Sequence, residues 1–170
     1  METTLRSDAM PNGYTRLQIA LHWVIFLLIA AQFLFHDGIQ AAWRAVIRGT
    51  DATFSVMAAQ HIFTGLLVLA LVVLRLAIKL RRGAPAMPAE EPEILKLTAR
   101  VTHWLLYGFM ILVPVSGAAA WFAVNENAAQ GHELFKSILL LLIALHFLGA
   151  LFQRFVLKSD VMTRMMRPNA

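Results

Sequence analysis

The sequence predicts an all-α membrane protein, a bundle of four transmembrane helices that forms a single domain over residues 1–170. Apolar residues occupy 59% of the 170 positions, where about 45–50% is usual for a soluble domain. Charged residues occupy only 15%, where about 25% is usual. A water-soluble fold of this size would expose too much apolar surface. A soluble enzyme and a disordered chain are therefore both excluded.

The first two apolar segments cover residues 17–35 and 54–78. Each provides the roughly 20 mostly apolar residues that a helix needs to cross a bilayer. Residues 1–14 before them lack a short apolar core with a small-residue cleavage site, so we expect no secretory signal. The polar residues 36–53 between the two segments are expected to form an outer loop in which His36 is solvated.

The third and fourth apolar segments cover residues 101–124 and 134–157. Residues 79–100 contain three prolines and three glutamates in a short stretch and are expected to form a loop. Residues 125–133 are the last polar connection. Pro114 is expected to kink the third helix, because proline lacks the N–H and clashes with the preceding turn.

Lysine and arginine residues gather on one side of the predicted bundle, and this side is expected to be cytoplasmic. Only Arg44, Arg48 and Lys136 lie on the other side, and Arg75 lies inside the second helix near its basic end. We therefore expect a multi-pass membrane protein with both termini in the cytoplasm. The net charge of +5 is then a topology signal, so the expected partner is membrane lipid and not nucleic acid.

The chain contains no cysteine. This excludes disulfides, iron–sulfur clusters, covalently attached c-type haem and thiol catalysis. Histidine is left as the main candidate for binding a metal.

Five of the six histidines lie in or at the ends of the apolar segments: His22, His61, His103, His132 and His146. Ionisable groups at membrane depth are costly and usually functional. A hydrogen bond to a neighbouring helix explains a single histidine equally well, but it does not easily explain five that are spread over all four helices.

His132 and His146 provide the most informative spacing. Fourteen residues of helix span about 21 Å, and at about 100° per residue the two rings point to nearly the same face. One helix therefore presents an imidazole near each membrane surface. At the outer level the partner is His61, while at the inner level depth alone leaves both His22 and His103 open.

Two stacked bis-histidine sites in a four-helix bundle suggest two b-type haems, each iron taking two axial nitrogens in an apolar slot. Zinc prefers four ligands, and neither level offers the cysteines or carboxylates that would complete them. A histidine proton relay is a further alternative, but no Asp or Glu lies within a predicted span. Arg16, Arg75 and Arg154 could pair with haem propionates or simply anchor the helices at the membrane surface.

Several motifs resemble the bacterial cytochrome b561 family. They are YTRLQIALHW at 14–23, the apolar run from His61 to VLRL at 73–76, HWLLY at 103–107, and PVSG at 114–117. His132, His146 and the C-terminal tail at 157–168 complete the pattern, which covers nearly the whole chain from Tyr14.

The resemblance implies that the last helix gives one axial ligand to the iron of each of two haem b groups. Carried over, His61 and His132 hold the outer haem, and His22 and His146 hold the inner haem. His103 would then lie near the inner haem or a quinone.

The resemblance also implies a function, since one member of the family is a superoxide oxidase. We expect a diheme membrane oxidoreductase, a superoxide:ubiquinone oxidoreductase that oxidises superoxide to oxygen on the periplasmic side and reduces ubiquinone. Its inner-haem or quinone neighbourhood would include His103, Arg75 and Arg16. Residues 124–131 contain no lysine or arginine, so Lys136, Arg44 and Arg48 are the candidates to steer the superoxide anion.

Two alternatives remain at this point. One is an electron-carrier cytochrome b subunit that relays electrons from a partner dehydrogenase, the donor protein, to quinone. The other is a structural four-helix membrane protein without redox activity.

Overall fold

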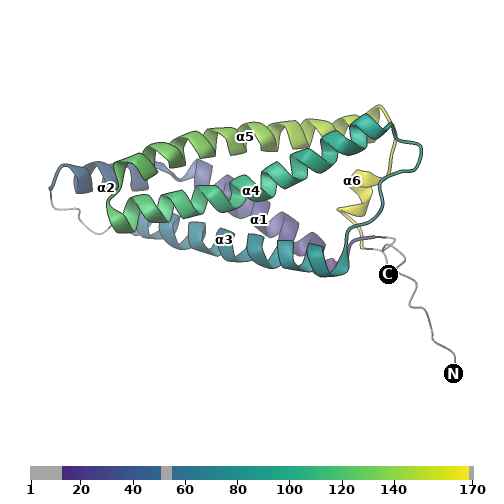
Figure 1. The fold of residues 1–170 in the computed structure, drawn as a ribbon. Helices are drawn as coiled ribbons and strands as arrows, with labels where there is room; N and C mark the ends of the chain where they lie inside the picture. The colour runs from purple at the N-terminus through teal and green to yellow at the C-terminus, as the bar shows by residue number, and fades with distance from the viewer. Residues whose placement is uncertain (1–12, 51–54, 169–170) are drawn as a thin grey trace, which may run out of the picture.

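The structure is a computed structural model that describes residues 13–50 and 55–168 (Figure 1). The expectation about a secretory signal concerns residues 1–14, which lie mostly outside the described residues. The described residues form four long and two short helices: α1 (Arg16–Leu34), α2 (Asp37–Ile47), α3 (Val56–Arg82), α4 (Glu93–Ala123), α5 (Glu126–Phe155) and α6 (Val161–Arg164). All four long helices are long and apolar enough to cross a membrane. The predicted all-α bundle of four transmembrane helices is confirmed.

The four long helices run roughly along one axis, with α2 at one end of the bundle and α6 at the other (Figure 1). The most extensive packing is between α4 and α5, and α3 packs against both α1 and α4. Within the described residues, α5 has hardly any close backbone contact with α1 or α3. The bundle therefore contains a space between α5 and these two helices that side chains or a ligand must fill.

Two helices begin well before the limits predicted from apolar content. α4 starts at Glu93 and not at residue 101, and α5 starts at Glu126 and not at residue 134. The start of α5 is fixed by Asn125, whose side chain accepts a backbone N–H at 3.0 Å. Apolar composition marks only the part of a helix that suits lipid, so it misses polar first turns. The predicted loop at 125–133 is therefore wrong, and the one at 79–100 is too long.

The first two spans agree better with the prediction. α1 differs from its predicted limits by one residue at each end. α3 begins at Val56 and ends at Arg82, against a predicted range of 54–78, and residues 51–54 lie outside the described residues. Its last turn is rich in basic residues, which interact favourably with the helix dipole, and Gly83 ends it with a φ of 76°.

The helix α2 lies within the predicted outer loop and corrects that prediction. Its sequence is amphipathic, with Ile39, Trp43 and Ile47 spaced four residues apart and charged residues such as Arg44 on the remaining surface. A pattern of this length is too short to span a membrane, and it suits a helix that lies across the end of the bundle.

The buried core is small for the size of the protein. One cluster joins Ile25, Val68 and Tyr107 from three helices, and a second joins Leu106 to α5. Many large apolar side chains point outward, among them Phe63, which is 72% exposed. Outward-facing apolar side chains are expected where lipid, not water, surrounds the helices.

The C-terminal segment folds back against the end of the bundle that carries α6. The indole Nε1 of Trp23 donates to the carbonyl oxygen of Met165 at 3.0 Å, and Arg164 donates to the carbonyl oxygen of Ala86 at 2.7 Å. These bonds tie the tail to α1 and to the loop between α3 and α4.

Candidate functional site

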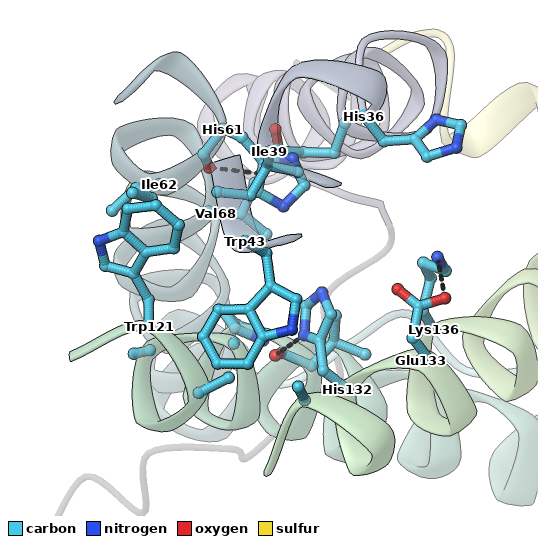
Figure 2. A pocket seen from close by; sticks show the side chains of 18 of the residues that line it. His36, Ile39, Trp43, His61, Ile62, Val68, Trp121, His132, Glu133 and Lys136 are labelled. Atoms are coloured by element: carbon cyan, nitrogen blue, oxygen red, sulfur yellow. Dashed lines mark hydrogen bonds and ion pairs between the residues drawn. The ribbon is translucent and has the colours of Figure 1, made fainter. Parts of the chain in front are cut away.

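The first site lies between α3 and α5, at the end of the bundle covered by α2. His61 of α3 and His132 of α5 have ring centroids 6.4 Å apart and ring planes at 74°. Both rings line a cavity of about 400 Å³ (Figure 2). Because α3 and α5 are not packed against each other, the two rings reach into a space between the helices.

The ring of His132 is fixed by the backbone of α4. Its Nδ1 lies 2.8 Å from the carbonyl oxygen of Val113, and the hydroxyl of Ser116 lies 3.5 Å from the same nitrogen. A carbonyl oxygen can only accept, so Nδ1 carries the proton and Nε2 keeps its lone pair. Gly117 leaves room for this ring, because a Cβ there would lie 2.9 Å from two ring atoms. A neutral imidazole with a free Nε2 is the form that binds a metal.

Helix α2 covers the outer end of the cavity. Ile39 and Trp43 of this helix are among the residues that line the cavity (Figure 2). The side chain of His36 is 40% exposed, which agrees with the expectation that it is solvated. His36 is also one of the lining residues, and its Nδ1 lies 2.8 Å from the carbonyl oxygen of Phe33. The segment predicted to be an outer loop therefore contains a helix that covers the first site.

The charged residues that line this cavity are two carboxylates and one lysine. Glu126, Glu133 and Lys136 are among its lining residues. The Nζ of Lys136 lies 2.6 Å from a carboxylate oxygen of Glu133, so the positive charge has an ion-pair partner (Figure 2). The expected steering residues Arg44 and Arg48 are exposed on α2 and are not part of the lining.

The second site lies toward the other end of the bundle, between α1, α4 and α5. The ring centroids of His22 and His146 are 6.3 Å apart, and the ring planes meet at 73°. His103 is also present, with its ring centroid 5.1 Å from that of His146. Its Nδ1 lies 2.6 Å from the carbonyl oxygen of Ala99. The structure therefore brings together all three histidines that were candidates for the inner level.

Arg75 of α3 belongs to this second site. It donates to the carbonyl oxygen of Gln18, which lies one helical turn before His22 on α1. Arg16 is instead exposed at the first residue of α1. Of the two arginines predicted for this neighbourhood, only Arg75 has contacts that tie it to the site.

Lys79 adds a second positive charge one turn along α3. Its Nζ lies 5.0 Å from the ring centroid of Trp104 and 4.8 Å from that of Tyr107, within the range of cation–π attraction. Among the described residues, neither Lys79 nor Arg75 has a carboxylate within ion-pair distance. Among the described residues, no ion pair therefore neutralises the positive charge of Arg75 or Lys79.

The His61–His132 pair of the first site and the His22–His146 pair of the second site each fit one metal atom between two imidazole nitrogens. Two metal–nitrogen bonds of about 2.0–2.1 Å, with about 1 Å from each nitrogen to its ring centroid, separate the centroids by roughly 6 Å. The pairs at 6.4 Å and 6.3 Å match this spacing, whereas the 5.1 Å between His103 and His146 is shorter. The described residues contain no group of three or more His, Cys, Asp and Glu that could hold a metal by themselves. Two imidazoles per site suit haem, whose macrocycle supplies the other four ligands.

Sequence comparison connects this arrangement to a family. The profile described as prokaryotic cytochrome b561 matches residues 13–168. The chain belongs to the prokaryotic cytochrome b561 family. Cytochromes b561 are membrane electron-transfer proteins that hold b-type haem, two in each bundle, so the predicted family and haem type are confirmed.

Three relatives of this cytochrome b561 chain cover almost its whole length. Cytochrome b562 of Cereibacter sphaeroides is 35% identical over 156 residues, which are 92% of this chain and 96% of that protein. The probable superoxide oxidase CybB of Yersinia pestis is 30% identical over an alignment of 182 positions, gaps included, that covers 92% of this chain and 97% of that protein. Cytochrome b561 homolog 1 of Escherichia coli is 26% identical over an alignment of 176 positions, gaps included, that covers 91% of this chain and 97% of that protein.

Several residues of this cytochrome b561 site are not identified by motifs. Gln32 and Trp43 line the outer cavity, and Lys79 lies at the inner site. Gln32 could have been found as a polar residue inside an apolar span, and Trp43 from the amphipathic pattern of α2. The carbonyl oxygen of Val113 leaves no signal in a sequence.

Proposed function

We propose that this protein is a diheme b-type oxidoreductase that takes electrons from superoxide on the periplasmic side and passes them to ubiquinone. One observation carries the proposal: His132 and His146 of the same helix, toward opposite ends of the bundle, each have a histidine of another helix at the spacing of a bis-imidazole metal site, His61 at 6.4 Å and His22 at 6.3 Å. Two metal sites at two depths support electron transfer across the membrane. The similarity to a probable superoxide oxidase supports superoxide as the donor.

The proposed ligands are His61 and His132 for the outer haem, and His22 and His146 for the inner haem. The spacing of each pair supports this assignment, and the shorter separation of His103 from His146 supports excluding His103. In our proposal His103 lies beside the inner haem or the quinone.

When bound, a haem iron with two imidazole ligands supplies one-electron transfer without an open coordination position. The residues around the outer site would control the access of water to it and the protonation of its histidine ligand. Trp43 and the apolar lining limit the access of water, while the carbonyl oxygen of Val113 keeps the proton of His132 on Nδ1. At the inner end, the positive charges of Arg75 and Lys79 would stabilise anionic groups such as propionates.

The proposed reaction oxidises two superoxide anions to two molecules of oxygen. One ubiquinone takes up the two electrons together with two protons and becomes ubiquinol. No proton is required where superoxide is oxidised, so the protons can enter entirely at the quinone.

We further propose that the chain works as one domain of the bacterial inner membrane, with both termini in the cytoplasm. Basic residues support this orientation. Arg16 at the start of α1, Arg81 and Arg82 at the end of α3, and Arg154 at the end of α5 gather at the end opposite α2. The basic end of a membrane bundle is normally cytoplasmic.

A second candidate function is an electron-carrier subunit that receives electrons from a partner dehydrogenase. The ion pair between Lys136 and Glu133 favours it, because a lysine neutralised at 2.6 Å attracts a small anion weakly. Glu126 adds a negative charge to the same lining.

The test uses haem-loaded protein purified in detergent and mixed with superoxide and a soluble ubiquinone analogue. We expect ubiquinol to form only when superoxide is supplied, and addition of superoxide dismutase to suppress it. A His132→Ala variant serves as the matched control and should lose the activity. If the wild-type protein carries haem but forms no ubiquinol from superoxide, the superoxide proposal fails. Ubiquinol formation driven by a co-purifying dehydrogenase would then establish the second candidate.

A further inference from the structure

Two buried polar side-chain atoms lack hydrogen-bond partners among the described residues, and both belong to the outer site. They are Nδ1 of His61 and Oε1 of Gln32. Buried polar groups are almost always paired, so each exception needs a physical reason. Here one atom is a ring nitrogen that can donate and the other is an amide oxygen that can only accept.

Gln32 is held next to His61 by the backbone. Its Nε2 donates to the carbonyl oxygen of His61 at 2.8 Å, across the interface between α1 and α3. This bond fixes which end of the amide is nitrogen and leaves Oε1 as the free acceptor. Gly65 provides the space, because a Cβ at that position would lie 3.2 Å from the same Nε2. Gln32 is therefore held among the residues that line the same cavity as His61, with its amide oxygen buried.

The partner histidine shows what is missing at His61. The Nδ1 of His132 already has the carbonyl oxygen of Val113 at 2.8 Å. A histidine that binds a metal through Nε2 carries its proton on Nδ1, and this N–H is nearly always given to an acceptor. His61 has no such acceptor in its own bonding pattern, although the orphaned oxygen of Gln32 lies on the neighbouring helix.

We propose that Gln32 is a positioning residue of the outer haem, and that its Oε1 accepts the Nδ1–H of His61 when Nε2 binds iron. This inference rests on the proposed role of His61 as an axial ligand. This single hydrogen bond would satisfy both orphaned atoms at once. Accepting this hydrogen bond makes the imidazole a stronger electron donor, which stabilises oxidised iron and lowers the reduction potential.

The experiment is a redox titration of the purified, haem-loaded protein, followed by the absorption of its two haems. In Gln32→Leu, which fills similar space without an acceptor, we expect one of the two potentials to rise while the other stays unchanged. In Gln32→Glu, which offers a stronger acceptor, the same potential should fall below the wild-type value. The matched control is Gln60→Leu. Gln60 precedes His61, but its side chain donates to Thr64 at 3.2 Å and does not line the cavity.

The possible outcomes separate this inference from the function on which it rests. Two haems with unchanged potentials in Gln32→Leu would overturn the role of Gln32 and leave the proposed function intact. If Gln32→Leu loses the outer haem, Gln32→Glu decides, because a potential at or above the wild-type value contradicts the inference. A wild-type protein that binds no haem would overturn both.

Discussion

Gly117 and the ring of His132 occupy adjoining space that leaves no room for another atom. A Cβ at position 117 would lie 2.9 Å from Cε1 and from Nδ1 of His132, closer than carbon and ring atoms approach in proteins. The ring itself is held by the carbonyl oxygen of Val113. A side chain at position 117 must therefore push His132 away from this bond.

We expect Gly117→Ala to weaken the outer haem site. The displaced ring would lose its hydrogen bond and its aim at the iron, so the haem content should fall from about two per chain toward about one. Quantifying extracted haem against protein measures this. Gly131→Ala is the matched control, since its Cβ would make only an ordinary contact of 3.7 Å with Phe135. Full haem content in Gly117→Ala would contradict the assigned position of the ring.

The ligand assignment predicts a pattern among single histidine variants. His61→Ala and His132→Ala should each lose the same haem, and His22→Ala should lose the other, leaving about one haem per chain in each case. His103→Ala should keep both haems, because its ring lies only 5.1 Å from that of His146. The absorption spectra of the reduced variants identify which haem remains. A loss of the inner haem in His103→Ala, but not in His22→Ala, would reverse the pairing.

The four spans could be predicted from sequence because their apolar content is a property of each segment alone. The helix ends could not, since the start of α5 depends on one capping side chain, that of Asn125. Apolar composition also did not predict the helix α2. Its amphipathic pattern is short, and only the cavity it covers gives it a role.

The candidate site was predictable in part for a similar reason. The spacing of His132 and His146 on one helix predicts histidine sites at two depths of the bundle, because helix geometry is regular. The choice between His22 and His103 depends on how α1 and α4 are placed around α5, which no spacing along one helix contains. Contacts between helices, such as that of Gln32 with the backbone of His61, are equally invisible before the fold is known.

The ion pair of Glu133 and Lys136 predicts how the rate of haem reduction by superoxide should change when either charge is removed. In Glu133→Gln, the freed lysine should attract the anion and raise the rate of haem reduction by roughly two- to ten-fold at low ionic strength. Lys136→Gln should lower the rate. Both differences should fade in high salt, because exposed charges are screened beyond a few ångströms. Stopped-flow mixing with superoxide over a range of salt concentrations makes the measurement. Equal rates in all three proteins at low salt would show that this pair does not influence the donor.

The pH dependence of stability is predicted to involve Tyr14, which precedes α1. Burial raises the pKa of its phenol above the usual 10.0, and the positive charge of Arg75 only partly opposes this. Above about pH 10 the unfolded chain therefore binds fewer protons at this group than the folded chain, and stability falls as pH rises. Thermal unfolding in detergent at increasing alkaline pH should show a shallower decline for Tyr14→Phe than for the wild type. Parallel declines would contradict this prediction.

The crossed imidazole planes, at 74° in the outer pair and 73° in the inner pair, have a magnetic consequence. Parallel rings on an iron would raise one of its two dπ orbitals above the other, whereas crossed rings act on both nearly equally. The unpaired electron of the oxidised low-spin iron then keeps much of its orbital angular momentum. If these two pairs hold haem iron as proposed, both haems should therefore give strongly anisotropic electron paramagnetic resonance signals at low temperature, and the shape of these signals would report how the helices orient the two rings.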